Sequence, residues 1–439
     1  MKLFRITIQV VLLLILASCE DFLEKEPVDA IAEEEAVTDT RSAEEAIAEL
    51  YASFYVLPNQ SLEALSDQAT GLFGFDDEFS LNSVAPESQL LNSIWRAQYQ
   101  TIVQANIVID RIAALDIEKR EQLVAEAKAI RACHYLTLVQ HWGDVPYSES
   151  PDYRVLEDLG RIATNEIYTN LVADLEQSQQ DLPVSYEDEG TTRTRFTQGG
   201  VTALLARTHL YSTNWVEAEA AATAVISHEL YALQSDYSNA FIKNSQESIL
   251  ELWSNAELFL GIGNAFLPFG LGGIQILLPT EKMSDAFEPG DVRRDISFSS
   301  DALGQMYVSK YPDVNRTGAF QEVKILRLAE MYLIRAEARA RQNDLTGAIT
   351  DINVIRSRAG LPATTADDQA SVLLAIEQER FVELAFEGHR WVDLVRTGRA
   401  NEVMEEFNPQ GWEPTDQLMP IPLMEIDLNP NILPQNPGY

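Results

Sequence analysis

Two glutamates, Glu383 and Glu387, form the pair of side chains in this sequence with the clearest capacity for acid–base chemistry. Paired carboxylates act as general acid and nucleophile in retaining glycoside hydrolases. Arg380 and Arg390 flank the pair, and a guanidinium beside a carboxylate keeps that carboxylate ionised. On a helix, residues four apart share one face, where such charges form a network. The sequence therefore favours a charge network over a hydrolytic pair, and it assigns no catalytic residue.

Other catalytic and cofactor motifs are absent from the sequence. The chain has no G-x-S-x-G, H-E-x-x-H or Walker sequence, and its five histidines are dispersed. Two contiguous acidic runs, 76–78 and 187–189, lack the alternating spacing of a calcium-binding loop. We expect solvated turns there, and we expect the protein to use no cofactor and no metal.

The amino-terminal segment has the pattern of a bacterial lipoprotein signal. Lys2 and Arg5 precede an apolar run over 6–16, which is too short to span a bilayer comfortably. The sequence L-A-S-C, ending at Cys19, then forms a lipobox. We expect residues 1–18 to be removed and Cys19 to carry the lipid, so that the protein is exported and tethered to a membrane. An ordinary signal peptide with an accidental cysteine is the alternative.

The charge balance limits the partners of the chain. Asp and Glu number 68 against 32 Lys and Arg, which gives a formal net charge of −36. Such a surface repels nucleic acid and anionic lipid headgroups, so we expect no nucleic-acid partner. Membrane attachment must then come from the lipid. The segment 19–40 is rich in acidic residues and fits a lipid-anchored tether. We expect residues 41–439 to form the body of the protein.

Helical periodicity recurs in pairs along the body. Two of these pairs have the small and aromatic residues of a tetratricopeptide-like repeat, in which adjacent helices approach closely. We therefore predict a mainly α fold, with a tetratricopeptide-like scaffold of helical pairs. The expected helices span residues 42–55, 91–115, 121–142, 200–211, 215–227, 323–341 and 345–359.

Two long irregular segments interrupt this pattern, near 58–95 and 235–320. The first is rich in Ser, Asn, Gly and Asp, and the second contains a β-like piece at 249–253 and a glycine-rich loop at 261–273. Long insertions on a rigid scaffold are where binding residues usually lie. We expect long loops and short strands in these insertions, and we expect binding to occur there.

Several motifs, in order along nearly the whole chain, resemble the SusD/RagB family of outer-membrane nutrient-binding lipoproteins. The most specific is the stretch 380–394, which is similar to the family signature RxxELxxEGxRxxDL. The other matching elements are the lipobox followed by E-D-F-L, the W-x3-Y-x2-I-x3-N pattern at 95–106, the RA…LV…GDVP element at 131–146, D-V-R-R at 291–294, P-I-P at 420–422 and the closing Q-N-P-G-Y at 435–439.

This resemblance implies a SusD-like lipoprotein on the outer membrane, anchored by lipid and facing the cell exterior. It implies binding of oligosaccharide or polysaccharide and delivery to a SusC-like TonB-dependent transporter, with no enzymatic activity. Two alternatives remain open. One is a RagB-like protein of the same transport system that binds peptides, and the other is a surface glycoside hydrolase.

Sugars stack their apolar faces on aromatic rings and bind polar side chains through their hydroxyl groups. Aromatic and polar residues of the two insertions are therefore the candidate ligand-binding residues. Trp95 stands at the edge of the first insertion, and its place on an apolar helical stripe favours core packing over stacking. The candidates are Phe73, Phe75, Asp76, Asn82, Trp95, Asn264, Phe266, Phe269 and Tyr307.

Overall fold

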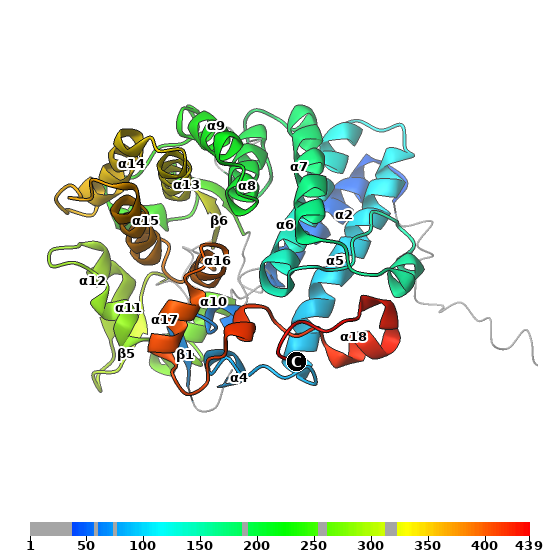
Figure 1. The fold of residues 1–439 in the computed structure, drawn as a ribbon. Coiled ribbons are helices and arrows are strands. Elements are labelled where there is room, and N and C mark those ends of the chain that lie inside the picture. Colours follow the sequence, from blue (N-terminus) through cyan, green and yellow to red (C-terminus); the bar gives the residue numbers. More distant parts are fainter. Residues whose placement is uncertain (1–36, 57–59, 73–76, 187–191, 253–260, 312–322) are drawn as a thin grey trace, which may run out of the picture.

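The computed structural model describes residues 37–439 except for 57–59, 73–76, 187–191, 253–260 and 312–322. The expected signal peptide and Cys19 therefore lie outside the described residues, as does most of the expected tether 19–40. Long helices follow one another in an arc, and short helices and strands fill the opposite side (Figure 1). This mainly helical architecture confirms the fold class predicted from the sequence.

Four helices form the first part of the arc, with α6 packed between α5 and α7. Their bounds are α2 (Thr40–Ala52), α5 (Gln89–Ala113), α6 (Arg120–Trp142) and α7 (Thr164–Asp181). The first helix begins where the Asp39 carboxylate accepts a hydrogen bond from the Ser42 N–H at 2.8 Å. The sequence analysis missed α7, whose buried apolar side consists of Ile167, Leu171 and Leu175 alone.

Two helical pairs with tetratricopeptide-like packing complete the arc, and a further helix packs against the second pair. The elements are α8 (Gln198–Tyr211), α9 (Trp215–Ile226), α13 (Leu328–Arg341), α14 (Leu345–Arg358) and α15 (Gln369–Glu383). Ala218, Ala222, Ala336 and Ala348 are fully buried, as close packing between helices requires. These pairs confirm the predicted repeats.

One predicted helix is wrong at its start. Residues 323–341 were expected to be helical throughout, but β6 (Lys324–Arg327) precedes the helix and pairs antiparallel with β2 (Ser248–Glu251). The pairing to a partner far away in the sequence overrides the local helical pattern. The β-like piece predicted from residue 249 onward is confirmed as far as Glu251.

Short elements fill the opposite side of the molecule. Antiparallel pairing of β1 with β3 joins the first insertion to the second, because Ala69 lies opposite Pro279. The strands are β1 (Ala69–Gly71), β3 (Leu277–Pro279), β4 (Phe298–Ser300) and β5 (Met306–Val308), and the helices are α3 (Gln60–Glu63), α4 (Asp77–Ser80), α10 (Gly261–Phe266), α11 (Glu281–Asp285) and α12 (Arg293–Ser297). The 3₁₀ helices are η2 (Ser53–Val56), η3 (Tyr153–Asp158), η4 (Tyr237–Ala240), η5 (Phe269–Leu271), η6 (Pro414–Gln417) and η7 (Pro430–Ile432).

The carboxyl-terminal segment returns to the end of α6. Its helices are α16 (Arg390–Arg396), α17 (Ala400–Phe407) and α18 (Leu423–Leu428). Trp142 Nε1 donates to Pro420 O at 2.9 Å, and Asn436 Nδ2 donates to Trp142 O at 2.9 Å. The P-I-P and Q-N-P-G-Y motifs therefore fasten the end of the chain to the helical arc.

The W-x3-Y-x2-I-x3-N motif on α5 has a similar positioning role. Tyr99 Oη donates to Pro146 O at 2.8 Å, and Asn106 Nδ2 donates to Ser148 O at 3.0 Å. Arg131 of α6 donates in turn to Asn106 Oδ1 at 2.7 Å. The segment that follows α6 is thus held along α5. Among the described residues, no helix has the length and apolar composition needed to cross a bilayer.

Candidate functional site

Both glutamates of the signature contact the same arginine side chain. Glu383 is the last residue of α15, and Glu387 lies in the turn that follows, so the two do not share one helix as expected. Arg327 of β6 joins them instead. Its Nη1 lies 2.6 Å from Glu383 Oε1, and its Nε lies 2.6 Å from Glu387 Oε2.

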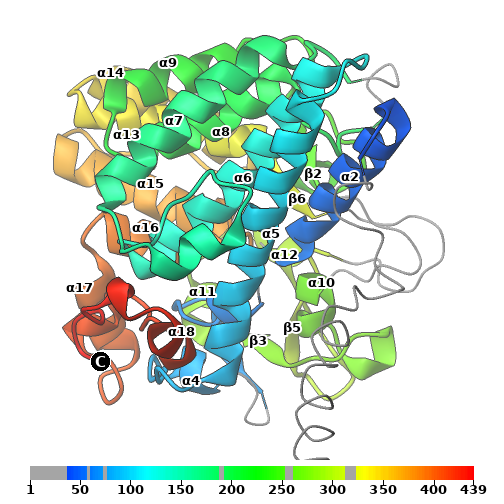
Figure 2. The same ribbon diagram turned by 90° about the vertical axis from the view of Figure 1, so that its right-hand side faces the viewer.

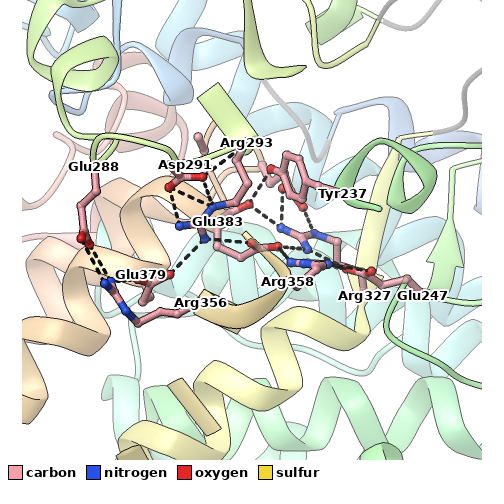
Figure 3. Close-up of polar contacts among 12 residues, drawn as sticks. Tyr237, Glu247, Glu288, Asp291, Arg293, Arg327, Arg356, Arg358, Glu379 and Glu383 are labelled. Carbon is pink, nitrogen blue, oxygen red and sulfur yellow. Dashed lines mark hydrogen bonds and ion pairs between the residues drawn. The ribbon is translucent and has the colours of Figure 1, made fainter. Parts of the chain in front are cut away.

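Around Arg327 and Glu383 the structure gathers a set of buried charged groups, which we call the ion cluster (Figure 3). Arg358 of α14 contacts Glu383 at 2.5 Å and Glu247 at 2.9 Å. Arg293 contacts Glu383 at 3.1 Å. The cluster consists of Glu247, Asp291, Arg293, Arg327, Arg356, Arg358, Glu379, Glu383 and Glu387.

Glu383 and Glu387 stay ionised within the cluster and act as fixed negative charges. Burial alone would raise the pKa of Glu383, but the guanidinium groups around it lower that pKa well below its ordinary value. Burial acts on Glu387 in the same direction, and Arg327 and Lys310 lower its pKa. Neither carboxyl group holds a proton to donate at neutral pH. The arrangement therefore supports the predicted charge network rather than a hydrolytic pair.

The predicted partners within the network were wrong. Arg380 binds Asp393, with Nε 2.7 Å from Oδ2, and Arg390 binds Asp67, with Nε 2.8 Å from Oδ1. The cationic side chains that neutralise the two glutamates come from other segments of the chain. Spacing along one helix predicts only neighbours on that helix, whereas the partners here are set by how the segments pack.

The turn that follows α15, residues 384–388, is where both insertions meet the helical scaffold. From the first insertion, Gln68 Oε1 accepts a hydrogen bond from Phe386 N at 3.2 Å. From the second, Lys310 Nζ donates to Ala385 O at 2.7 Å and Tyr311 Oη donates to Phe386 O at 2.9 Å. Gly388 has a φ of +79°, a conformation that glycine adopts without steric cost. The signature therefore positions the insertions.

Beside this turn lies a cavity of about 110 Å³, lined in part by Glu63, Arg207, Glu387 and Trp391. Glu63 Oε2 accepts a hydrogen bond from Gly388 N at 3.0 Å. Within the described part of the chain, Glu63 Oε1 is buried and has no hydrogen-bond partner. Burial raises the pKa of Glu63 to about 7. Sequence reasoning missed this group, because nothing in its local sequence signals burial.

The predicted ligand-binding residues do not form one described surface. Phe73, Phe75 and Asp76 lie outside the described residues. Phe266 is completely buried and packs edge-on against Phe386, with ring centroids 5.0 Å apart, so it offers no ring face to a ligand. Asn82 is buried, and its Nδ2 donates to Leu65 O at 3.0 Å.

The other candidates have different degrees of exposure. Phe269 is 71% exposed on η5, and Tyr307 is half-buried on β5. Asn264 Oδ1 has no hydrogen-bond partner among the described residues. Trp95 is buried between Tyr99 and Trp142, with ring centroids 5.0 and 5.3 Å away, which agrees with the core packing favoured from the sequence.

Two surface clefts offer further space for a ligand. One, of about 520 Å³, runs along α5 and is lined by Trp95 and Tyr99 among others. The second, of about 620 Å³, lies between α7 and the loop that joins α8 to α9, where Tyr168 and Asn214 contribute to its lining. Both volumes lie within the range of about 300 to 1,000 Å³ that is typical of small-molecule sites.

Comparison with known proteins places the chain among those with this architecture. A family model described as "SusD family" matches residues 301–439, and one described as "Starch-binding associating with outer membrane" matches residues 21–210. The SusD-like protein P25 of Formosa agariphila is 27% identical, with all of both chains covered. The starch-binding protein SusD of Bacteroides thetaiotaomicron is 31% identical over 191 residues, which are 41% of this chain and 31% of the relative.

Solved structures share the fold. A laminarin-binding SusD-like protein superposes with a TM-score of 0.79 at 24% identity, covering 92% of this chain and 100% of that protein. A SusD superfamily protein from Parabacteroides distasonis gives a TM-score of 0.80 at 24% identity with the same coverage. These likenesses establish the architecture over almost the whole chain.

The ion cluster yields a prediction about stability. Replacing Glu383 with glutamine keeps the shape of the side chain but leaves three buried guanidinium groups with one carboxylate fewer. We expect E383Q to lower the free energy of unfolding by about 3–5 kcal/mol, measured by urea denaturation. E402Q at the surface is the control, with an expected change within about 0.5 kcal/mol. Equal stability of E383Q and the wild type would contradict the role assigned to the cluster.

Glu63 yields a prediction about pH. Because its pKa is raised from 4.5 to about 7 in the folded state, the folded protein holds a proton that the unfolded chain releases. The stabilising contribution of Glu63 is therefore complete below pH 4.5 and is lost as the pH rises through 7. We expect E63Q, which cannot lose this proton, to gain up to about 3 kcal/mol over the wild type between pH 4.5 and 8.

The measurement is urea denaturation of both proteins across that pH range, again with E402Q as the control for removal of one surface charge. A difference between E63Q and the wild type that stays constant with pH would show that Glu63 does not titrate in this way.

Proposed function

This chain belongs to the SusD/RagB family, and on that premise we propose that it is a lipoprotein of the outer membrane surface that binds oligosaccharide and passes it to a SusC-like TonB-dependent transporter. The observation that carries the proposal is the match of residues 21–210 to the model described as starch-binding and associating with the outer membrane. A second support is the 31% identity to a starch-binding protein within part of the chain.

The geometry is consistent with binding without catalysis. The strongest candidate for an acid–base pair, Glu383 with Glu387, is already neutralised by the buried guanidinium group of Arg327. The two insertions are joined to each other by β1 and β3 and are held to the scaffold by the turn 384–388. A surface supported in this way is preorganised, which lowers the ordering cost of capturing a ligand.

The attachment to the membrane in this proposal depends on Cys19. A single acyl chain binds membranes only marginally, whereas several chains on one cysteine give stable anchoring. The net charge of −36 opposes any electrostatic attraction to anionic headgroups, so the lipid must supply the binding energy. Residues 19–40 then separate the lipid from the globular body.

Calorimetric titration tests the binding function. The wild-type protein is titrated with malto-oligosaccharides, with laminarin-derived oligosaccharides and with a mixture of short peptides. We expect saturable binding of one glycan class and no binding of the peptides. We also expect no release of new reducing ends when the bound glycan is incubated with the protein. Saturable binding of peptides alone would favour the RagB-like alternative, and sustained hydrolysis would favour a glycoside hydrolase.

Replacing Cys19 with alanine tests the anchor. We expect C19A to lose the acyl chains and to leave the membrane fraction, while its affinity for the glycan stays equal to that of the wild type. The measurement is fractionation of cells followed by mass spectrometry of the recovered protein. Replacing Cys133, which is buried in α6, with alanine is the matched control, and we expect that variant to stay in the membrane fraction. Membrane attachment of the C19A variant would exclude Cys19 as the site of lipidation.

A further inference from the structure

The cleft along α5 is a groove formed by several elements. Figure 2 shows α5 facing the viewer, with α2 beside its upper part and α18 beside its lower part. Glu49 of α2 and Glu425 of α18 contribute to the lining, and Tyr153 of η3 contributes an exposed ring. The groove has a volume of about 520 Å³, and apart from Trp95, at the edge of the first insertion, its lining lies outside the two insertions that the sequence analysis singled out.

The lining of α5 consists of two parallel stripes. Residues at a spacing of four lie above one another on a helix. One stripe is aromatic and aliphatic and comprises Trp95, Tyr99, Val103 and Ile107. The neighbouring stripe is polar and comprises Arg96, Gln100, Gln104 and, further along, Arg111. From residue 96 to residue 111 the helix advances about 22 Å at 1.5 Å per residue, so the groove has the form of a furrow.

The polar side chains of this furrow are available to a ligand. In the part of the chain that the structure describes, the side chains of Gln100, Gln104 and Arg111 make no hydrogen bond or ion pair. The nearest partner of Arg96 is Glu425, at the long distance of 3.8 Å. Tyr153 is 59% exposed. A row of amide and guanidinium donors whose single ion pair within the described residues is the long one of Arg96, next to aromatic rings, matches the two faces of a sugar chain.

The charges of the furrow indicate an uncharged ligand. Arg96 and Arg111 are balanced by Glu49 and Glu425, so the furrow has no formal net charge, although the whole chain carries −36. An anionic ligand would be repelled by the rest of the surface, and a cationic one would gain more elsewhere. A neutral chain with hydroxyl groups meets no such penalty in the furrow.

We infer that the furrow along α5 is a second contact surface for a neutral oligosaccharide, which lies lengthwise along the helix and stacks on Tyr153. The inference rests on the proposed glycan-binding function and adds a surface that lies outside the two insertions except at Trp95. Gln100 and Gln104 donate to the sugar hydroxyls, and Arg96 and Arg111 bind it nearer the ends of the furrow. Only a ligand long enough to follow the helix uses the whole surface.

Two variants test this surface. Y153A removes the exposed ring, and Q100A/Q104A removes two amides. The double variant Q89A/Q180A is the matched control, because Gln89 and Gln180 are exposed and lie outside the furrow. Each protein is titrated calorimetrically with a neutral hexasaccharide of the glycan class that the wild type binds. We expect both test variants to bind it about fivefold more weakly, as the loss of one or two hydrogen bonds or of one stacking contact implies, and the control to match the wild type.

The outcomes separate the two proposals. Unchanged hexasaccharide affinity in both test variants, with binding by the wild type, overturns the furrow and leaves the proposed function intact. Absence of glycan binding by the wild type overturns the proposed function and the furrow together. The inference is also overturned if the test variants bind a peptide or a second copy of the chain more weakly than the wild type does, but bind the glycan equally well. Urea denaturation midpoints equal to that of the wild type establish that the surface substitutions act on binding and not on folding.

Discussion

The buried ion cluster around Arg327 and Glu383 constrains how the helical repeats meet the insertions. Removing charged groups from water costs several kcal/mol for each ion, and only close, correctly directed partners offset that cost. Here the partners come from four separate segments, namely β6, α14, α15 and the segment around residue 291. A small shift of any one of these segments leaves a buried charge without its partner. The cluster therefore admits one arrangement of them.

That arrangement fixes the position of the turn 384–388, and the hydrogen bonds of this turn fix the positions of the insertions. Its carbonyl oxygens accept hydrogen bonds from Lys310 and Tyr311, while its Gly388 N–H donates to Glu63. Strands β1 and β3 tie the two insertions together. The irregular half of the molecule is thus connected to the rigid half through a few specific polar contacts, which explains how long irregular segments hold a defined position.

The helices could be predicted because their apolar spacing is a local property of the sequence. Among the long helices of the arc before residue 359, only α7 was missed, and it buries only a narrow apolar stripe. The helices after residue 359 were not given ranges from the sequence, and β6 was mistaken for helix because its partner strand lies more than 70 residues earlier. The sequence predicted a charge network at Glu383 and Glu387, but it did not predict the arginines that pair with them. Arg327 and Arg358 have no sequence signal that links them to these glutamates, since only the packing of β6 and α14 against α15 brings them together.

The same limit applies to the proposed binding surface. The sequence directs attention to the aromatic residues of the insertions, yet Phe266 is in the core and the exposed furrow lies on a regular helix. A stripe at a spacing of four residues predicts a buried face, and Trp95 is indeed buried against Trp142. Whether the adjoining polar stripe is covered depends on how far α2 and α18 extend over it. Because Tyr99 and Asn106 fasten α5 to the segment after α6, the furrow stands on a rigid support. Such support is what a long, flexible sugar needs in order to bind without a large cost in ordering the protein.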